Sequence, residues 1–269
     1  MSDRDPNQWS DPGPYRADQI HDGDPYELSD GHAIHCMSGG GRHGQSHIVG
    51  GSVLDSDPAV TSSGTDTGIA FNDDKNLRAP DIVVNVDMNS DGWVREAPPL
   101  AVEYASVGQD QKELTKKISE LLEFGTRYIW VVHLTGPLRV EVHERGLPTR
   151  IVPGDGTLTA PGVLQNPVPV RALVDRDAAH EATLHNLLTS RGYASIDAIR
   201  EAGRDAGREE GREEQLARVR GALQQQLQAR GWTLAPSLQA RIAACTDILV
   251  LMRWSNASIT AASAEAALR

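Results

Sequence analysis

A helical segment between two strand-like runs constrains the fold of this chain most. Residues 111–124 carry apolar side chains at positions 114, 118, 121 and 122, the spacing of a helix with one buried face, and Gly125 is a natural stop. Leu100–Ala105 precedes the segment as a strand, and Tyr128–Leu134 follows it as a continuous apolar run of the buried-strand type. This order indicates a sheet with a helix packed on it.

Shorter segments extend that sheet on both sides. A strand is predicted at 81–86, directly after Pro80, and residues 138–143 alternate like a half-exposed hairpin partner. Upstream, residues 26–34 predict two strands that turn at Asp30-Gly31, and residues 67–71 predict a short strand. Residues 38–44 are expected to be a loop, while residues 47–54 fit a helix or a strand equally. The predicted class is α+β or α/β, with a mixed sheet flanked by helices.

The chain divides into four predicted parts. Residues 1–24, rich in Asp, Pro, Gly and Asn, are expected to form a mobile leader without a packed core. Residues 25–175 hold the sheet domain. Residues 176–230 predict a long charged helix, a candidate coiled coil with Gly-Arg at 203, 207 and 211, and residues 231–269 predict a small helical hairpin. Close helix–helix approach could offset the cost of these glycines, and a solvated helical linker is the alternative.

The predicted long helix carries one apolar stripe that something must cover. Its members are spaced three, four and four residues apart, at Leu216, Val219, Leu223 and Leu227. A second copy of the chain is the favoured occupant, which predicts a homodimer through the C-terminal helix. Packing against residues 238–254 of the same chain is the alternative.

Charge and composition exclude some classes of protein. Of the 269 residues, 37 are acidic and 26 are Lys or Arg, and the net charge of −11 argues against non-specific, high-affinity nucleic-acid binding. A local basic groove or a divalent-cation site stays compatible with this balance. No run of 18 apolar residues exists, the N-terminus is polar, and Cys36 and Cys245 lie far apart. We therefore expect no membrane span and a cytoplasmic location.

Two carboxylates are placed to meet at one end of the sheet. Asp81 opens one predicted strand and Glu103 lies near the end of the next, at similar distances from Gly92 in the loop between them. If the strands pair antiparallel about that loop, the two side chains lie on neighbouring strands at the same end. Such a pair is a typical magnesium site.

A lysine falls on the buried face of the central helix. At 100° per residue, Lys117 shares the stripe of Leu114 and Ile118, whereas Lys112 and Lys116 point roughly the other way. A buried ammonium needs a partner, which the carboxylate pair would supply. The alternative is that Lys117 extends along the edge of the stripe towards water.

These segments together resemble a known family. The matching segments, in order and spacing, are Arg78-Ala-Pro-Asp81, Pro99-Leu-Ala-Val-Glu103-Tyr-Ala-Ser106, Lys117 eight residues before Gly125, and Tyr128-Ile-Trp-Val-Val. They resemble the Uma-two family of restriction-endonuclease-like proteins, within the wider PD-(D/E)xK nuclease group. The resemblance covers roughly residues 24–175, and the helical C-terminus resembles extensions of some members.

The resemblance implies roles for individual residues. Asp81 and Glu103 would be the metal ligands, for magnesium or manganese, and Lys117 would replace the signature lysine, whose place is taken by Ala105. The implied activity is metal-dependent hydrolysis of phosphodiester bonds in nucleic acid, with DNA as the expected substrate. His43 and Ser106 are candidate substrate contacts. A carboxylate that some relatives place on the first helix is missing from residues 44–54, which leaves open a nuclease fold that no longer cuts and acts in binding or assembly.

Two other motifs suggest different chemistry. Asp66-Thr67-Gly68 spells the aspartic-protease tripeptide, but one copy would need a dimer, and a tight turn before a strand is the simpler interpretation. A group of histidines and one cysteine could bind zinc, although their spacing contains no paired knuckles; its members are His32, His35, Cys36, His43 and His47.

Overall fold

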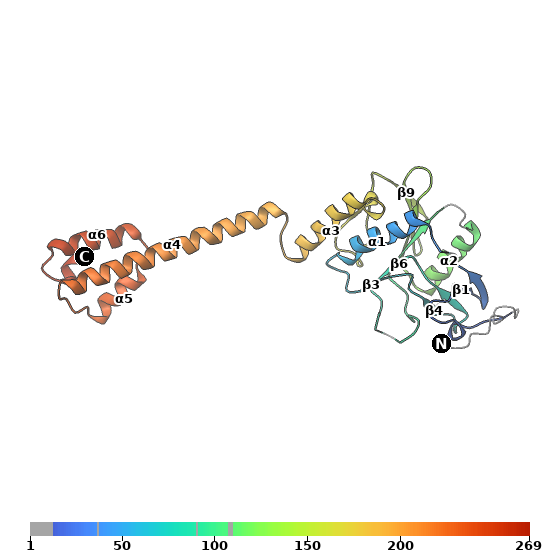
Figure 1. Cartoon of the computed structure of the whole chain (residues 1–269), viewed down its shortest axis with the longest axis horizontal. Helices are drawn as coiled ribbons and strands as arrows, with labels where there is room; N and C mark the ends of the chain where they lie inside the picture. Colours follow the sequence, from blue (N-terminus) through green and yellow to red (C-terminus); the bar gives the residue numbers. More distant parts are fainter. Residues whose placement is uncertain (1–12, 37, 90, 107–109) are drawn as a thin grey trace. The chain divides into compact units, whose positions relative to one another are not determined.

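The computed structural model describes residues 13–36, 38–89, 91–106 and 110–269. It divides into two compact units, Met1–Ala194 and Ser195–Arg269, which we call the N-terminal and C-terminal units and describe separately. A mixed sheet flanked by helices forms the first and helices form the second (Figure 1), so the predicted fold class is confirmed.

The main sheet has six strands in the order β10-β9-β8-β7-β6-β3. Strands β7 and β8 run parallel and are joined through helix α2, and the other pairs are antiparallel. The predicted strand–helix–strand segment is therefore the centre of the sheet. The bounds are β3 Ser63–Thr65, β6 Ile82–Val84, β7 Leu100–Ala105, α2 Gln111–Phe124, β8 Tyr128–His133, β9 Arg139–Glu144 and β10 Arg150–Pro153.

Helices cover both faces of this sheet. Along β7, Leu100, Val102 and Tyr104 join the core beneath α1 (Gly41–Asp55) and α3 (Arg176–Ser190), and Ala101 and Ala105 join the core beneath α2. This alternation is the two-residue period of a strand buried on both faces. The side chain of Glu103 lies on the same face of β7 as Ala101 and Ala105, the face that α2 covers. The α1 face also holds the two-stranded β11 (Thr157–Leu158) and β12 (Val168–Pro169) and the 3-10 turn η2 (Val170–Leu173).

A second sheet has the order β2-β1-β5-β4 and corrects the prediction of a coreless leader. Residues 1–12 of that leader lie outside the described residues. Residues 13–24 do pack, because Tyr15, Ala17 and Ile20 bury their side chains against this sheet at and around the 3-10 turn η1 (Ala17–Gln19). The predicted hairpin is β1 (Tyr26–Ser29) and β2 (His32–His35), and the other strands are β4 (Ile69–Phe71) and β5 (Asn76–Arg78).

Helix α1 corrects the prediction of a loop over 38–44, because it begins at Gly41, and it resolves the ambiguous segment as helical. Burial of Val49, Val53 and Leu54 on the sheet stabilises a helix that its glycines disfavour. Gly50 is required for this packing. A methyl group there would lie 2.0 Å from the hydroxyl oxygen of Tyr104 on β7.

The C-terminal unit covers its own apolar stripe. Helix α4 (Ile196–Ala229) buries Leu216, Leu223 and Leu227 against α5 (Pro236–Ala244), α6 (Ile248–Thr260) and α7 (Ala264–Ala267). The favoured occupant of the stripe, a second copy of the chain, is therefore wrong: the alternative, packing within the chain, is what the structure has. The dimer prediction loses its premise.

The Gly-Arg segment of α4 has no helix packed on its glycines. A methyl group built on Gly203, Gly207 or Gly211 would meet no described atom within 4 Å. The solvated-helix alternative therefore describes this segment. The prediction of one long helix over 176–230 is wrong, because helix α3 ends at Ser190 and α4 begins at Ile196. Helix α3 packs with α1 in the N-terminal unit. Among the described residues, no helix is long and apolar enough to span a bilayer.

Candidate active site

The strand register brings Asp81 and Glu103 to the same end of the sheet. β6 and β7 pair antiparallel with Ile82 opposite Val102, so Asp81, one residue before β6, continues the register opposite Glu103. Both side chains are buried, at 9% and 2% exposure. The backbone amide of Tyr104 donates a hydrogen bond of 2.5 Å to Oδ2 of Asp81, which fixes that carboxylate beside the strand that carries Glu103.

Lys117 reaches this end of the sheet from α2. Its Nζ lies 2.7 Å from Oε1 of Glu103 and 3.0 Å from Oε1 of Glu27, and it donates a 2.8 Å hydrogen bond to the carbonyl of Ala79. Three acceptors match the three hydrogens of an ammonium group. Lys116, by contrast, is exposed and pairs with Asp30 at 3.5 Å.

A second buried cation completes what we call the ion-pair cluster: Glu27, Arg78, Glu103, Lys117 and Glu120. The guanidinium of Arg78, only 1% exposed, binds Oε2 of Glu120 at 2.5 Å and Oε2 of Glu27 at 3.0 Å. Glu27 also accepts a hydrogen bond from the backbone amide of Ala79. The cluster therefore holds β1, β5 and α2 together around Glu103.

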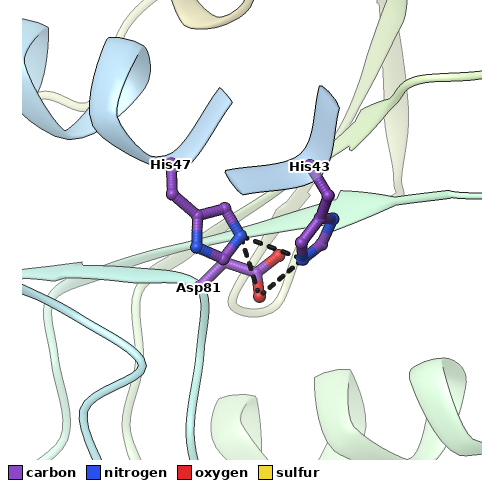
Figure 2. Close-up of side chains that lie close together, drawn as sticks. All are labelled: His43, His47 and Asp81. Carbon is purple, nitrogen blue, oxygen red and sulfur yellow. Dashed lines mark hydrogen bonds and ion pairs between the residues drawn. The ribbon is translucent and has the colours of Figure 1, made fainter. Parts of the chain in front are cut away.

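On the other side of Asp81 lies the histidine cluster, defined as His43, His47 and Asp81. The Nε2 atoms of the two imidazoles are 3.0 Å apart, and Oδ1 of Asp81 lies 3.4 Å from that of His47 and 3.7 Å from that of His43. Figure 2 shows both rings, which extend from α1, directed toward the carboxylate. The ring of His47 also stacks on Tyr104, with centroids 5.4 Å apart. Tyr104 thus orients two members of the cluster, one by its amide and one by its ring.

The charges of the site shift several pKa values. Burial raises the pKa of Glu103 to about 8, with Asp81 and Glu27 adding to the effect and Lys117 opposing it. Burial alone would lower the pKa of Lys117, but Glu103 and Glu27 outweigh it and raise that pKa. Burial would raise the pKa of Asp81, but the neighbouring imidazole of His47 and the charge of Lys117 lower it. For His47, burial is outweighed by Asp66 and Asp81, which raise its pKa to about 9.

The structure brings some of the predicted site residues together and leaves others apart. Lys117 contacts Glu103 but makes no hydrogen bond or ion pair with Asp81, although both residues are described. Ser106 is exposed just after β7. Of the zinc candidates, only His43 and His47 meet, whereas the others lie along β2 or just after it.

Other contributors were not predicted. Asp66 lies between β3 and β4 and has a left-handed backbone conformation. Its carboxylate is 3.7 Å from Nδ1 of His47. Glu27 supplies an additional carboxylate from β1, whereas the family resemblance implies one on the first helix. The four-residue spacing of His43 and His47 is the one local signal that could have paired them, since it places two side chains on one helical face.

Comparison with known proteins identifies the family of this chain. Residues 14–169, more than half of the chain, match the Uma2 family, which is described as "Putative restriction endonuclease". The chain belongs to the Uma2 family. The expected family is thereby confirmed, and its match covers the strands, both sheet-covering helices α1 and α2, and every residue of the two clusters.

A solved structure supports the fold. The crystal structure of a putative nuclease from Anabaena variabilis ATCC 29413 superposes with a TM-score of 0.52 at 20% sequence identity, covering 62% of this Uma2 chain and 99% of that chain. At this identity the likeness shows the fold alone. No protein with a curated description matches the sequence.

Proposed function

We propose that the chain is a metal-dependent nuclease that hydrolyses phosphodiester bonds, with DNA as its substrate and magnesium or manganese as its cation. The observation that carries the proposal is the convergence of Asp81, Glu103 and Lys117. They come from three separate segments, and the register and the 2.7 Å ion pair bring them to one end of the sheet. Membership of a nuclease family supports the same activity.

The donor set fits a divalent cation. Four buried or nearly buried carboxylates, of Glu27, Asp81, Glu103 and Glu120, lie beside two buried permanent cations, Arg78 and Lys117, while the exposed Lys116 is 3.9 Å from Glu120. Burial raises the pKa of Glu103, and the negative charges of Asp81 and Glu27 add to that effect. Hard carboxylate oxygens are the ligands that magnesium and manganese take, so Asp81 and Glu103 would hold the ion.

Each residue would have a separate task. A bound cation would neutralise charge on the scissile phosphate and lower the pKa of a water molecule. Lys117 keeps Glu103 oriented and adds positive charge where the pentacovalent phosphorus becomes more negative. His43, with a side chain 20% exposed, and the exposed Ser106 would contact the phosphate backbone. A groove of about 350 Å³ beside His47, between α1 and β3, offers approach to this end of the sheet.

Cleavage of plasmid and single-stranded DNA, with RNA alongside, tests the proposal. We expect cleavage with magnesium or manganese, none with chelator, and loss of cleavage in Asp81→Asn and Glu103→Gln. Lys116→Ala is the matched control for Lys117→Ala, because the two lysines are neighbours on α2 and only Lys117 is buried. A chain that binds nucleic acid but never cuts it would favour the alternative of a binding or assembly module.

A further inference from the structure

The histidine cluster contains the donor atoms of a metal site that the two-carboxylate scheme does not use. Its ligand atoms are separated by 3.0, 3.4 and 3.7 Å. A metal about 2.0–2.2 Å from each ligand would separate neighbouring ligand atoms by about 3.3–3.6 Å in a tetrahedron. The three groups are therefore spaced as they would be around one ion, with little movement required.

The surroundings of His47 and Asp81 orient these donors as they are oriented in metal sites, whereas Nδ1 of His43 is buried without a hydrogen-bond partner among the described residues. The Nε2 atom of each imidazole points inward, and Nδ1 of His47 faces the carboxylate of Asp66 at 3.7 Å. A carboxylate behind a histidine is the usual outer partner of a metal ligand, because it fixes the ring and raises its basicity. On Asp81, Oδ2 accepts the amide of Tyr104, so Oδ1 is the atom left facing the imidazoles.

We propose that His43, His47 and Asp81 bind one divalent transition-metal ion of the manganese-to-zinc series, in preference to magnesium. Imidazole nitrogen suits these borderline metals, whereas magnesium prefers oxygen ligands and retains its waters. Three protein ligands leave a further position for water or a phosphate oxygen, the arrangement of catalytic sites. Asp81 is shared with the two-carboxylate site of the proposed nuclease, so the assignment rests on that function for its catalytic meaning. It adds the two histidines as ligands of the cation and narrows the choice of cation there.

The competing interpretation is that no ion binds and that His47 remains an imidazolium between Asp81 and Asp66. A second competitor is an ion held by Asp81 and Glu103 alone. The three interpretations differ in which side chains control binding. Only the first requires both histidines.

Calorimetric titration of the full-length, chelator-treated protein with zinc, manganese and magnesium chlorides separates them. We expect one zinc ion per chain, bound at least about tenfold tighter than magnesium. His43→Ala and His47→Ala should each weaken zinc binding by at least about tenfold. His180→Ala, an exposed histidine on α3, is the matched control and should leave binding unchanged. Thermal unfolding without metal verifies that each variant is folded.

Two results would overturn the assignment. One is the absence of stoichiometric zinc or manganese binding to the folded wild-type protein. The other is binding that Glu103→Gln abolishes and the histidine variants leave intact. Because the readout is metal binding, a protein that binds zinc through the histidines yet cuts no nucleic acid would refute the nuclease proposal and keep this one.

Discussion

The ion-pair cluster and the histidine cluster flank the same end of the sheet but differ in how their polar atoms are satisfied. In the ion-pair cluster, the ammonium of Lys117 and the guanidinium of Arg78 already have carboxylate partners. In the histidine cluster, the two imidazoles are within hydrogen-bond distance of each other, but the carboxylate oxygen of Asp81 lies 3.4 and 3.7 Å from them, farther than in a good hydrogen bond. The first cluster therefore maintains the geometry of the site, and the second is the side available to a ligand.

The largest expected effect is the loss of folding stability when the ion-pair cluster loses its lysine. Lys117→Met leaves Glu103 and Glu27 buried without their ammonium partner, which should lower the free energy of unfolding by ~3–5 kcal/mol. Urea denaturation measures this change. Lys116→Met, at an exposed ion pair, should cost less than ~1 kcal/mol. Equal losses in the two variants would contradict the structural role of the cluster.

The second effect is a dependence of stability on pH that belongs to the histidine cluster. The pKa of His47 is raised to about 9 in the folded protein, above its ordinary value of 6.5, so the folded state binds the proton more tightly than the unfolded state. The resulting stability is complete below pH 6.5 and is lost as pH rises to 9, by on the order of 3 kcal/mol.

Comparison of wild type with His47→Gln, both free of metal, isolates this contribution. The difference in their free energies of unfolding, measured by urea denaturation from pH 6 to pH 9.5, should shrink as pH rises. A constant difference across that range would mean that His47 is not held as a cation by Asp66 and Asp81.

The third effect tests how closely α1 must approach the sheet to present its histidines. Gly50→Ala places a methyl group against the Tyr104 hydroxyl and should destabilise the protein by ~1–3 kcal/mol. Gly44→Ala, on the same helix with open space around it, should be neutral or stabilising by up to ~1 kcal/mol. Thermal or urea unfolding measures both. Adding Tyr104→Phe to Gly50→Ala should recover part of the loss, and no recovery would place the clash elsewhere.

The smallest effect on stability is expected at Asp81 itself. Asp81→Asn keeps a side-chain oxygen for the Tyr104 amide, and removing a negative charge beside Glu103 offsets part of the lost attraction to His47, so the free energy of unfolding should fall by only about 1 kcal/mol. The same variant should lose zinc binding and cleavage. A loss above 3 kcal/mol in urea denaturation would mean that Asp81, like the ion-pair cluster, maintains the folded structure.

Local periodicity explains what could be predicted from sequence. Helix α2 and strands β7 and β8 follow their apolar patterns closely, and the burial of Lys117 follows from its place on the α2 stripe. Helix α1 was ambiguous because its glycines conceal its periodicity, and its stability comes from packing against the sheet. Without a helix at 41–55, the four-residue spacing of His43 and His47 could not be used.

The partners of the site residues were harder to predict because they come from distant segments. Glu27 lies on a different sheet from Glu103, and no pattern within β1 indicates that it meets Lys117. The role of Tyr104 depends on its backbone amide and on a ring that stacks on another element. The surface that covers the α4 stripe could not be predicted either, because a second copy of the chain and residues 238–254 of the same chain both offer apolar side chains.

The uncovered first half of α4 has a consequence for digestion by proteases. From residue 199 to residue 215 every side chain is exposed, and Gly203, Gly207 and Gly211 each weaken the helix by ~1 kcal/mol relative to alanine. Exposed ion pairs such as Arg208–Asp205 offset only a small part of this lost helix stability, and salt screens them. The segment should therefore open locally more often than either unit unfolds. Trypsin, which cuts after arginine, would part the chain there first, and more rapidly as ionic strength rises.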